Sequence, residues 1–141
     1  MKPLILIALL SLYCSAVKAQ LNQSRSQAMQ LMANDDTWTF DKTGRTNDGT
    51  EYLSYKTPIE MSSDGNVIIT TKLLFFLNDT CLLIKTVRTN NQLNDVIKDM
   101  NKRFVSLGNN IWYDNKEKIK YEIILTENYS VFTVQETPLP K

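Results

Sequence analysis

Two strongly apolar runs, separated by a short polar pair, constrain most what this chain can fold into. The runs are Leu73–Leu77 and Leu82–Ile84, and Asn78 and Asp79 lie between them. Asn and Asp tolerate the backbone of a tight turn, and β-forming runs on both sides of such a pair are typical of a hairpin. The sequence therefore predicts that a long strand, Val67–Leu77, returns as the antiparallel strand Cys81–Val87 to form the central hairpin.

Two segments have the apolar spacing of helices. In the second and clearer one, apolar residues recur at i, i+3, i+4, i+7 and i+11 and form one stripe: Leu93, Val96, Ile97, Met100 and Phe104. Asn90 or Asn91 is expected to cap its start, and Gly108 to provide a left-handed stop. The first predicted helix, Gln20–Asn34, has a thinner apolar face and is expected to lie on a sheet; this face holds Leu21, Ala28, Leu31 and Met32.

The remaining β-forming runs complete an α+β fold. They are Thr37–Thr43, Glu51–Lys56, Ile111–Tyr113, Ile119–Thr126 and Ser130–Gln135. The predicted order is α-β-β-β-β-α-β-β-β, and its short connections favour a mostly antiparallel sheet with the two helices packed on one face. The alternation along Lys118–Ile123 indicates that the other face is in contact with water, whereas the strand order in the sheet stays open.

An internal repeat of two αβββ-like units is one interpretation of this order. Both halves run from a helix through a Trp-bearing strand and a polar turn to a Tyr-bearing strand. In this repeat the corresponding residues of the two halves, which we call the residue echo, are Met29, Trp38, Asp41 and Glu51–Leu53 in the first and Met100, Trp112, Asp114 and Tyr121–Ile123 in the second. Chance similarity of two ordinary α+β units explains it equally well. In outline the two units are similar to small exported modules of the β-lactamase-inhibitor-protein-like kind, an architectural analogy that carries no function.

The first nineteen residues have the features of a secretory signal peptide. Lys2 supplies the positive start, Leu4–Leu10 an apolar stretch too short to span a membrane, and Val17–Ala19 the small residues of a cleavage site. We expect cleavage near Ala19, export to the periplasm or the extracellular space, a single domain over 20–137, and a frayed tail over 138–141. Lipidation of Cys14 is a weaker alternative, because the bulky Tyr13 precedes it.

Several kinds of chemistry are disfavoured by composition. The chain contains no histidine, and Cys81 is the one cysteine left after residues 1–19 are removed, so no internal disulfide and no catalytic set built on histidine is expected. Cys81 lies in an apolar β-forming run and is interpreted as a buried, inert thiol, with an intermolecular disulfide as the alternative.

No metal-ligand motif or phosphate-binding glycine loop occurs, so no cofactor is expected and the chain is not expected to be an enzyme. The remaining catalytic option is a carboxylate pair from Asp35, Asp36, Asp41, Glu51, Asp114 and Glu122.

The charge balance limits the partners. The full chain has sixteen basic and fifteen acidic residues. This balance gives no excess of positive charge for binding nucleic acid or an anionic membrane. No membrane span is expected after cleavage, and the oligomeric state stays open. A protein or an envelope component is therefore the expected kind of partner.

The style of the chain also resembles small exported proteins of the Bacteroidota. The features that carry this resemblance are the short signal before Gln20, the hairpin Phe75–Cys81, the helix Leu93–Phe104, Trp112 and Tyr121–Ile123. The resemblance implies export from a bacterial cytoplasm and transfers no site residues.

The strand aromatics provide the main functional hypothesis. Trp112 and Tyr113 are adjacent in a strand, so they point to opposite sides and one of them must leave the main core. An aromatic residue on the wet face beside Asp114 would suit a partner surface, because Trp and Tyr anchor such interfaces. We therefore expect a non-enzymatic, exported binding domain that acts through an open sheet face, with Trp112, Tyr113 and Asp114 as the candidate partner surface. The alternative is a carrier or sensor of a small apolar ligand, held beneath Leu93, Ile97 and Met100 between the helices and the sheet; a small carboxylate-dependent hydrolase is a minor third hypothesis.

Overall fold

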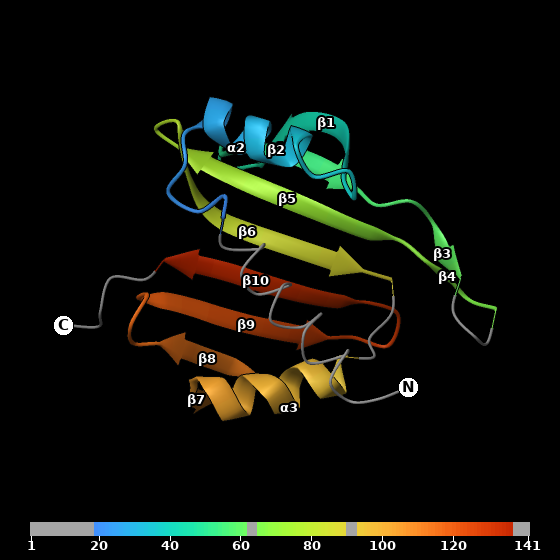
Figure 1. Ribbon diagram of the computed structural model, residues 1–141, viewed down its shortest axis with the longest axis vertical. Helices are drawn as coiled ribbons and strands as arrows, with labels where there is room; N and C mark the ends of the chain where they lie inside the picture. Colours follow the sequence, from blue (N-terminus) through green and yellow to red (C-terminus); the bar gives the residue numbers. More distant parts are fainter. Residues whose placement is uncertain (1–18, 62–64, 90–92, 137–141) are drawn as a thin grey trace.

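The computed structural model describes residues 19–61, 65–89 and 93–136 (Figure 1). The predicted signal segment up to residue 18, the predicted tail and the proposed caps Asn90 and Asn91 lie outside these ranges. Within them, a mostly antiparallel open sheet of eight strands carries two helices on one face, so the predicted α+β fold is confirmed.

Ten strands and two helices make up the described part of the chain. The helices are α2 (Arg25–Ala33) and α3 (Asn94–Arg103). The main sheet has the order β1-β2-β5-β6-β10-β9-β8-β7 and is formed by β1 (Thr39–Arg45), β2 (Glu51–Lys56), β5 (Thr70–Leu77), β6 (Thr80–Arg88), β7 (Val105–Gly108), β8 (Ile111–Asp114), β9 (Ile119–Leu125) and β10 (Ser130–Glu136). A separate two-stranded ribbon is formed by β3 (Glu60–Met61) and β4 (Val67–Ile68).

The sheet consists of two halves with the same outline. In one half α2 is followed by β1, β2, β5 and β6, and in the other α3 is followed by β7, β8, β9 and β10. Antiparallel pairing of β6 with β10 joins them. The residue echo expected from the sequence does not follow this outline, because Trp38 precedes the first strand of its half whereas Trp112 lies on the second.

Both helices have a boundary that differs from the sequence prediction. The first helix begins only after Ser24, whose side chain accepts a hydrogen bond from the Gln27 amide, while the Gln27 side chain accepts one from the Ser24 amide. The residues before it pair instead with the start of β6, where the Asn22 amide donates to the Cys81 carbonyl. In the second half, Gly108 ends a strand rather than a helix, because the chain becomes extended at Phe104 and continues into β7.

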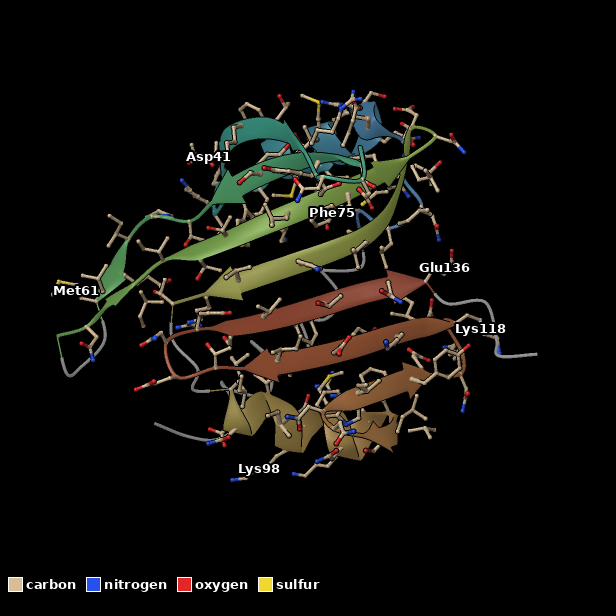
Figure 2. The ribbon with its side chains drawn as sticks, turned by 180° about the vertical axis from the view of Figure 1, so that it is seen from behind. Asp41, Met61, Phe75, Lys98, Lys118 and Glu136 are labelled. Carbon is tan, nitrogen blue, oxygen red and sulfur yellow. The ribbon has the colours of Figure 1, made fainter. Side chains whose placement is uncertain are left out.

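The hydrophobic core lies between the helices and the sheet face beneath them. The predicted central hairpin is present as β5 and β6, with Leu74 opposite Ile84. The long strand predicted over 67–77 is divided, because Val67–Ile68 pairs with β3 in the separate ribbon and β5 begins at Thr70. Alternate side chains of β9 are buried, as the pattern predicted. Ala28 and Met32 of α2 and Met100 of α3 are completely buried in this core, whereas Leu31, expected on the same face as Met32, is exposed. Both helices therefore cover one face, and the other face carries no described helix (Figures 1 and 2).

Lys72 is the buried charge of this helix-side face. It lies on β5 between Tyr55 and Thr86 on the neighbouring strands, and its side chain is 2% exposed. Its ammonium nitrogen lies 4.3 Å from the centre of the Trp38 ring, a cation–π contact that partly offsets the loss of water. Desolvation lowers the pKa of Lys72 to about 8, although the charge of Asp35 acts in the opposite direction.

This burial makes stability depend on pH. Between pH 8 and 10.5 the unfolded chain holds a proton at Lys72 that the folded chain has lost, so the contribution of Lys72 to stability rises with pH across this window. The rise should reach about 3 kcal/mol. Cys81 acts with the opposite sign above pH 9, because burial raises its pKa to about 12. We therefore expect the free energy of unfolding of the wild type, relative to Lys72→Met, to increase from pH 8 to pH 10.5 in urea denaturation.

The comparison with Lys72→Met removes the contribution of Cys81, which both proteins share. Lys98→Met, which removes an exposed ammonium from α3, controls for the loss of one positive charge. A difference between wild type and Lys72→Met that stays constant over this window would contradict the burial of a charged Lys72.

Candidate functional site: the open face of the sheet

The face of the sheet opposite the helices forms a broad surface of mixed character (Figure 2). Cross-strand register and strand alternation assign side chains of β1, β2, β5, β6, β8, β9 and β10 to it. Its apolar centre, half-buried by the neighbouring strands, consists of Tyr52, Leu73, Phe75, Leu83, Val87 and Val131. We call this surface the open face.

An aromatic pair lies at one end of the open face. Tyr52 on β2 is opposite Phe75 on β5, with ring centres 5.7 Å apart and planes tilted by 47°. The Tyr52 ring lies across Gly44 of β1, where any Cβ atom would collide with it. Glycine at this position therefore lets the ring lie flat on the neighbouring strand, a known way of covering a glycine in a sheet.

A hollow of about 370 Å³ adjoins this pair, between the β1–β2 loop and the β5–β6 hairpin. Phe75, Leu82 and Leu83 supply apolar walls, and Asp48, Thr50 and Lys85 supply polar ones. The ammonium nitrogen of Lys85 lies 5.8 Å from the centre of the Phe75 ring. Because one acid and one base line this hollow, it suits an apolar group of a ligand or a partner without selecting the sign of its charge.

Lysines outnumber acids among the described strand side chains of the open face. The lysines are Lys42, Lys56, Lys85 and Lys120, and the acids are Asp41 and Glu122. Asp41 accepts a hydrogen bond from the Ser54 hydroxyl at 3.2 Å and pairs with the Lys56 ammonium at 3.0 Å. The hydrogen bond from Lys56 is the largest cause that lowers the pKa of Asp41. Lys120 and Glu122 lie 3.6 Å apart, so the surplus positive charge comes from Lys42 and Lys85.

A second hollow, of about 430 Å³, opens at the same end of the sheet beside the start of α2. Two arginines in its wall share one carboxylate, with Arg25 2.8 Å and Arg45 2.6 Å from the two oxygens of Glu51. Arg25 also lies over the Phe76 ring, 5.9 Å from its centre. This arrangement fixes the β1–β2 loop against α2.

The three residues expected to form the partner surface lie in different surroundings. Trp112 is 1% exposed, and its indole nitrogen donates to the side-chain oxygen of Asn101 at 2.7 Å, so it is unavailable to a partner. Tyr113 lies half-buried on the open face. Because side chains alternate along a strand, either Trp112 or Tyr113 had to lie on this face. Asp114 accepts hydrogen bonds from the amides of Lys116 and Glu117 and thereby fixes the β8–β9 turn. Of the three, Tyr113 alone remains a candidate contact.

Five of the six acidic residues considered for catalysis, all but Asp36, form hydrogen bonds or ion pairs within the described structure. Glu51 is bound by arginines, Asp41 by Lys56, and the Asp35 side chain accepts from the Thr37 amide at 3.0 Å. The lowered pKa of Asp41 is opposite to the direction that a general acid at neutral pH needs. Cys81 is buried, as predicted, and its raised pKa keeps the thiol protonated.

No group of three or more cysteine, aspartate or glutamate residues that could hold a metal ion occurs within residues 19–61, 65–89 and 93–136. Neither α2 nor α3, the helices of the described part of the chain, has the length and apolar character needed to cross a membrane. In comparisons of the chain with protein families, with curated proteins and with solved structures, nothing matched.

Sequence reasoning missed the pairing of Tyr52 with Phe75. Both residues were assigned to strands, but their shared face depends on the register between β2 and β5. The usable signal is Gly44, because a glycine inside a strand often marks the place where another side chain or backbone comes close.

The arrangement of Gly44 and Tyr52 makes a stability prediction. In Gly44→Ala the new methyl group should push the Tyr52 ring off β1, at a cost of about 1–2 kcal/mol in the free energy of unfolding. Chemical denaturation measures this loss. In a Tyr52→Ala background the same substitution should cost almost nothing, so an equal cost in both backgrounds would show that the ring is not the cause.

Proposed function

We propose that this chain is an exported, non-enzymatic binding domain whose open face docks a protein or an envelope component. The observation that carries the proposal is the Tyr52–Phe75 pair beside a hollow, on a sheet face that no described helix covers. Aromatic side chains that are partly exposed beside a cavity are the usual anchors of protein interfaces.

The charge of the open face supports a partner of a particular kind. The whole chain is nearly neutral, with sixteen basic and fifteen acidic residues, but lysines predominate among the described strand side chains of the open face. Lys85 beside Phe75 combines a positive charge with an apolar wall. A partner surface that combines apolar groups with carboxylates would complement both features.

Export rests on the sequence of the first nineteen residues. Lys2, the apolar stretch Leu4–Leu10 and the small residues before Gln20 have the order of a cleavable signal. The resemblance to small exported proteins of the Bacteroidota agrees with this, and an envelope component of a bacterium would then be within reach of the open face.

The alternative function is a carrier of a small apolar ligand, which requires a cavity beneath Leu93, Ile97 and Met100. Met100 is completely buried, and Leu93 and Ile97 pack against the same core. The two hollows described above lie elsewhere, at the end of the sheet where the β1–β2 loop meets the β5–β6 hairpin. We prefer the binding domain because the partly exposed Tyr52–Phe75 pair beside one of these hollows supports it directly.

Site-specific photo-cross-linking in the native host tests the docking face. A photoreactive phenylalanine analogue in place of Lys85 lies beside the hollow, whereas the same analogue in place of Lys98 lies on α3, on the other face. We expect covalent adducts from position 85 and not from position 98, because the partner covers the open face. Gel electrophoresis and mass spectrometry of the adducts give the readout.

Two further variants make the result specific. Adding Tyr52→Ala to the protein with the probe at position 85 should reduce the adduct several-fold, whereas adding Met29→Ala, on an exposed part of α2, should leave it unchanged. Adducts from position 98 alone, or from neither position, would contradict docking on the open face.

Intact mass tests the export step separately. The protein purified from its own host should have the mass of residues 20–141, because the peptidase is expected to cut after Ala19. An unprocessed chain, or a chain lipidated at Cys14, would show that the first nineteen residues have another role. Either result would leave the test of the open face intact.

A further inference from the structure

Four polar side chains gather at one end of the helix-side face, where β5 begins and β6 ends beside the β3–β4 ribbon (Figure 1). Lys72 of β5 is directly opposite Thr86 of β6, and Arg88, two residues further along β6, is opposite Thr70. The Thr70 carbonyl accepts a hydrogen bond from the Thr57 amide at 3.1 Å, so Thr57 continues the pairing of β2. Strand alternation places all four side chains on this face. We call Lys72, Thr86, Arg88 and Thr57 the polar corner.

Three polar atoms of the polar corner are buried without a hydrogen-bond partner. They are the hydroxyl oxygens of Thr57 and Thr86 and the Nε atom of Arg88, and Thr86 is only 3% exposed. No acid among the described residues lies within ion-pair distance of the Lys72 ammonium, and the charge of Asp35 acts on it from farther away. Buried polar groups in native proteins are nearly always paired, so several orphaned groups on neighbouring strands indicate a missing acceptor.

The charges of the polar corner favour a ligand that carries one negative charge. The Arg88 guanidinium is paired with Glu60, whose carboxylate lies 3.8 Å from its Nη2 atom. Lys72 then remains as the cation that lacks an ion-pair partner among the described residues. A carboxylate offers one negative charge and two acceptor oxygens, which suffice for the Lys72 ammonium and the Thr86 hydroxyl. A phosphate group carries up to two negative charges, more than this corner neutralises.

Aromatic rings border the polar corner and suit the apolar part of an organic acid. Trp38 lies over Lys72, with 4.3 Å between the ammonium nitrogen and the ring centre, and Tyr55 of β2 is opposite Lys72. Arg88 is 39% exposed, so the corner reaches the surface at this side chain. Exposed side chains change rotamer within nanoseconds, so Arg88 can move aside and admit a ligand. Apolar walls around a few polar groups are the usual composition of small-molecule sites.

We propose that the polar corner binds a small organic acid, whose carboxylate accepts hydrogen bonds from the Lys72 ammonium and the Thr86 hydroxyl. The Nε–H of Arg88 and the Thr57 hydroxyl lie beside the same carboxylate, and the Trp38 ring contacts the apolar part of the acid. The ligand thus supplies the acceptors that the polar corner lacks. The polar corner lies on the face opposite the open face, so this proposal does not depend on docking there.

Isothermal titration calorimetry with sodium hexanoate tests the proposal on the protein expressed as the full chain and purified in the form that the cell leaves. We expect a dissociation constant on the order of 0.1–1 mM, the range of a small ligand with one charge. Lys72→Met should raise this constant at least tenfold, because it removes the cation and keeps a side chain of similar length. Absence of binding up to about 10 mM hexanoate would show that water alone satisfies the orphaned groups and would overturn the proposal.

Matched variants locate the bound carboxylate. Thr86→Val removes the buried hydroxyl and keeps the shape of the side chain, so it should weaken hexanoate binding several-fold. Thr133→Val makes the same change at a buried threonine of β10 on the opposite face, and Lys98→Met removes an exposed ammonium from α3. Both of these controls should bind hexanoate as the wild type does. Undiminished binding in Lys72→Met and Thr86→Val would place hexanoate elsewhere and overturn the proposal.

Thermal unfolding without ligand provides the control for the fold. Because the Thr86 hydroxyl is unpaired in the free protein, Thr86→Val should keep or raise the midpoint of the thermal transition. Weaker binding of hexanoate by this variant then reflects the lost hydrogen bond. A lowered midpoint would show that the hydroxyl already has a partner in the free protein and would overturn the proposal.

Two further probes identify the group that is recognised. Hexan-1-ol keeps the apolar chain without the charge, and sodium phosphate keeps a negative charge without the chain, so each should bind at least tenfold more weakly than hexanoate. In carbon-13 NMR the Cε signal of Lys72 should shift on addition of hexanoate, whereas that of the exposed Lys98 should not. Equal binding of hexan-1-ol, or tighter binding of phosphate, would assign the polar corner to another class of ligand and overturn the proposal.

Discussion

The pairing of β6 with β10 is the interaction on which the rest of the structure depends. It places Ile84 opposite Val134 and Thr86 opposite Phe132, and it is the junction between two four-stranded halves that are each local in sequence. Without it, each half would expose the unpaired edge of a central strand. Because the junction is antiparallel and in register, the helix-side faces of both halves become one face. The opposite face of the joined sheet is the open face.

The part of the fold that is visible in the sequence is the part with a strong local pattern. The β5–β6 hairpin follows from two apolar runs around Asn78 and Asp79, and β9 follows from strict alternation. β7 is invisible because Val105–Gly108 is short and directly continues an amphipathic helix. The pairing of β3 with β4 is hidden because Pro58 normally ends a strand, and here the chain resumes pairing after it.

The candidate site was predictable in kind but not in detail. Adjacency alone showed that Trp112 or Tyr113 must leave the core, but not which one. Two non-local contacts place Trp112 in the core. Trp112 is opposite the buried Tyr121, and its indole nitrogen donates a hydrogen bond to the side-chain oxygen of Asn101 on α3. The Tyr52–Phe75 pair likewise depends on the β2–β5 register, which the connecting residues 57–69 do not reveal. Which side chains are buried depends on how the strands are paired, and the register between strands that are distant in the sequence is set by the whole sheet.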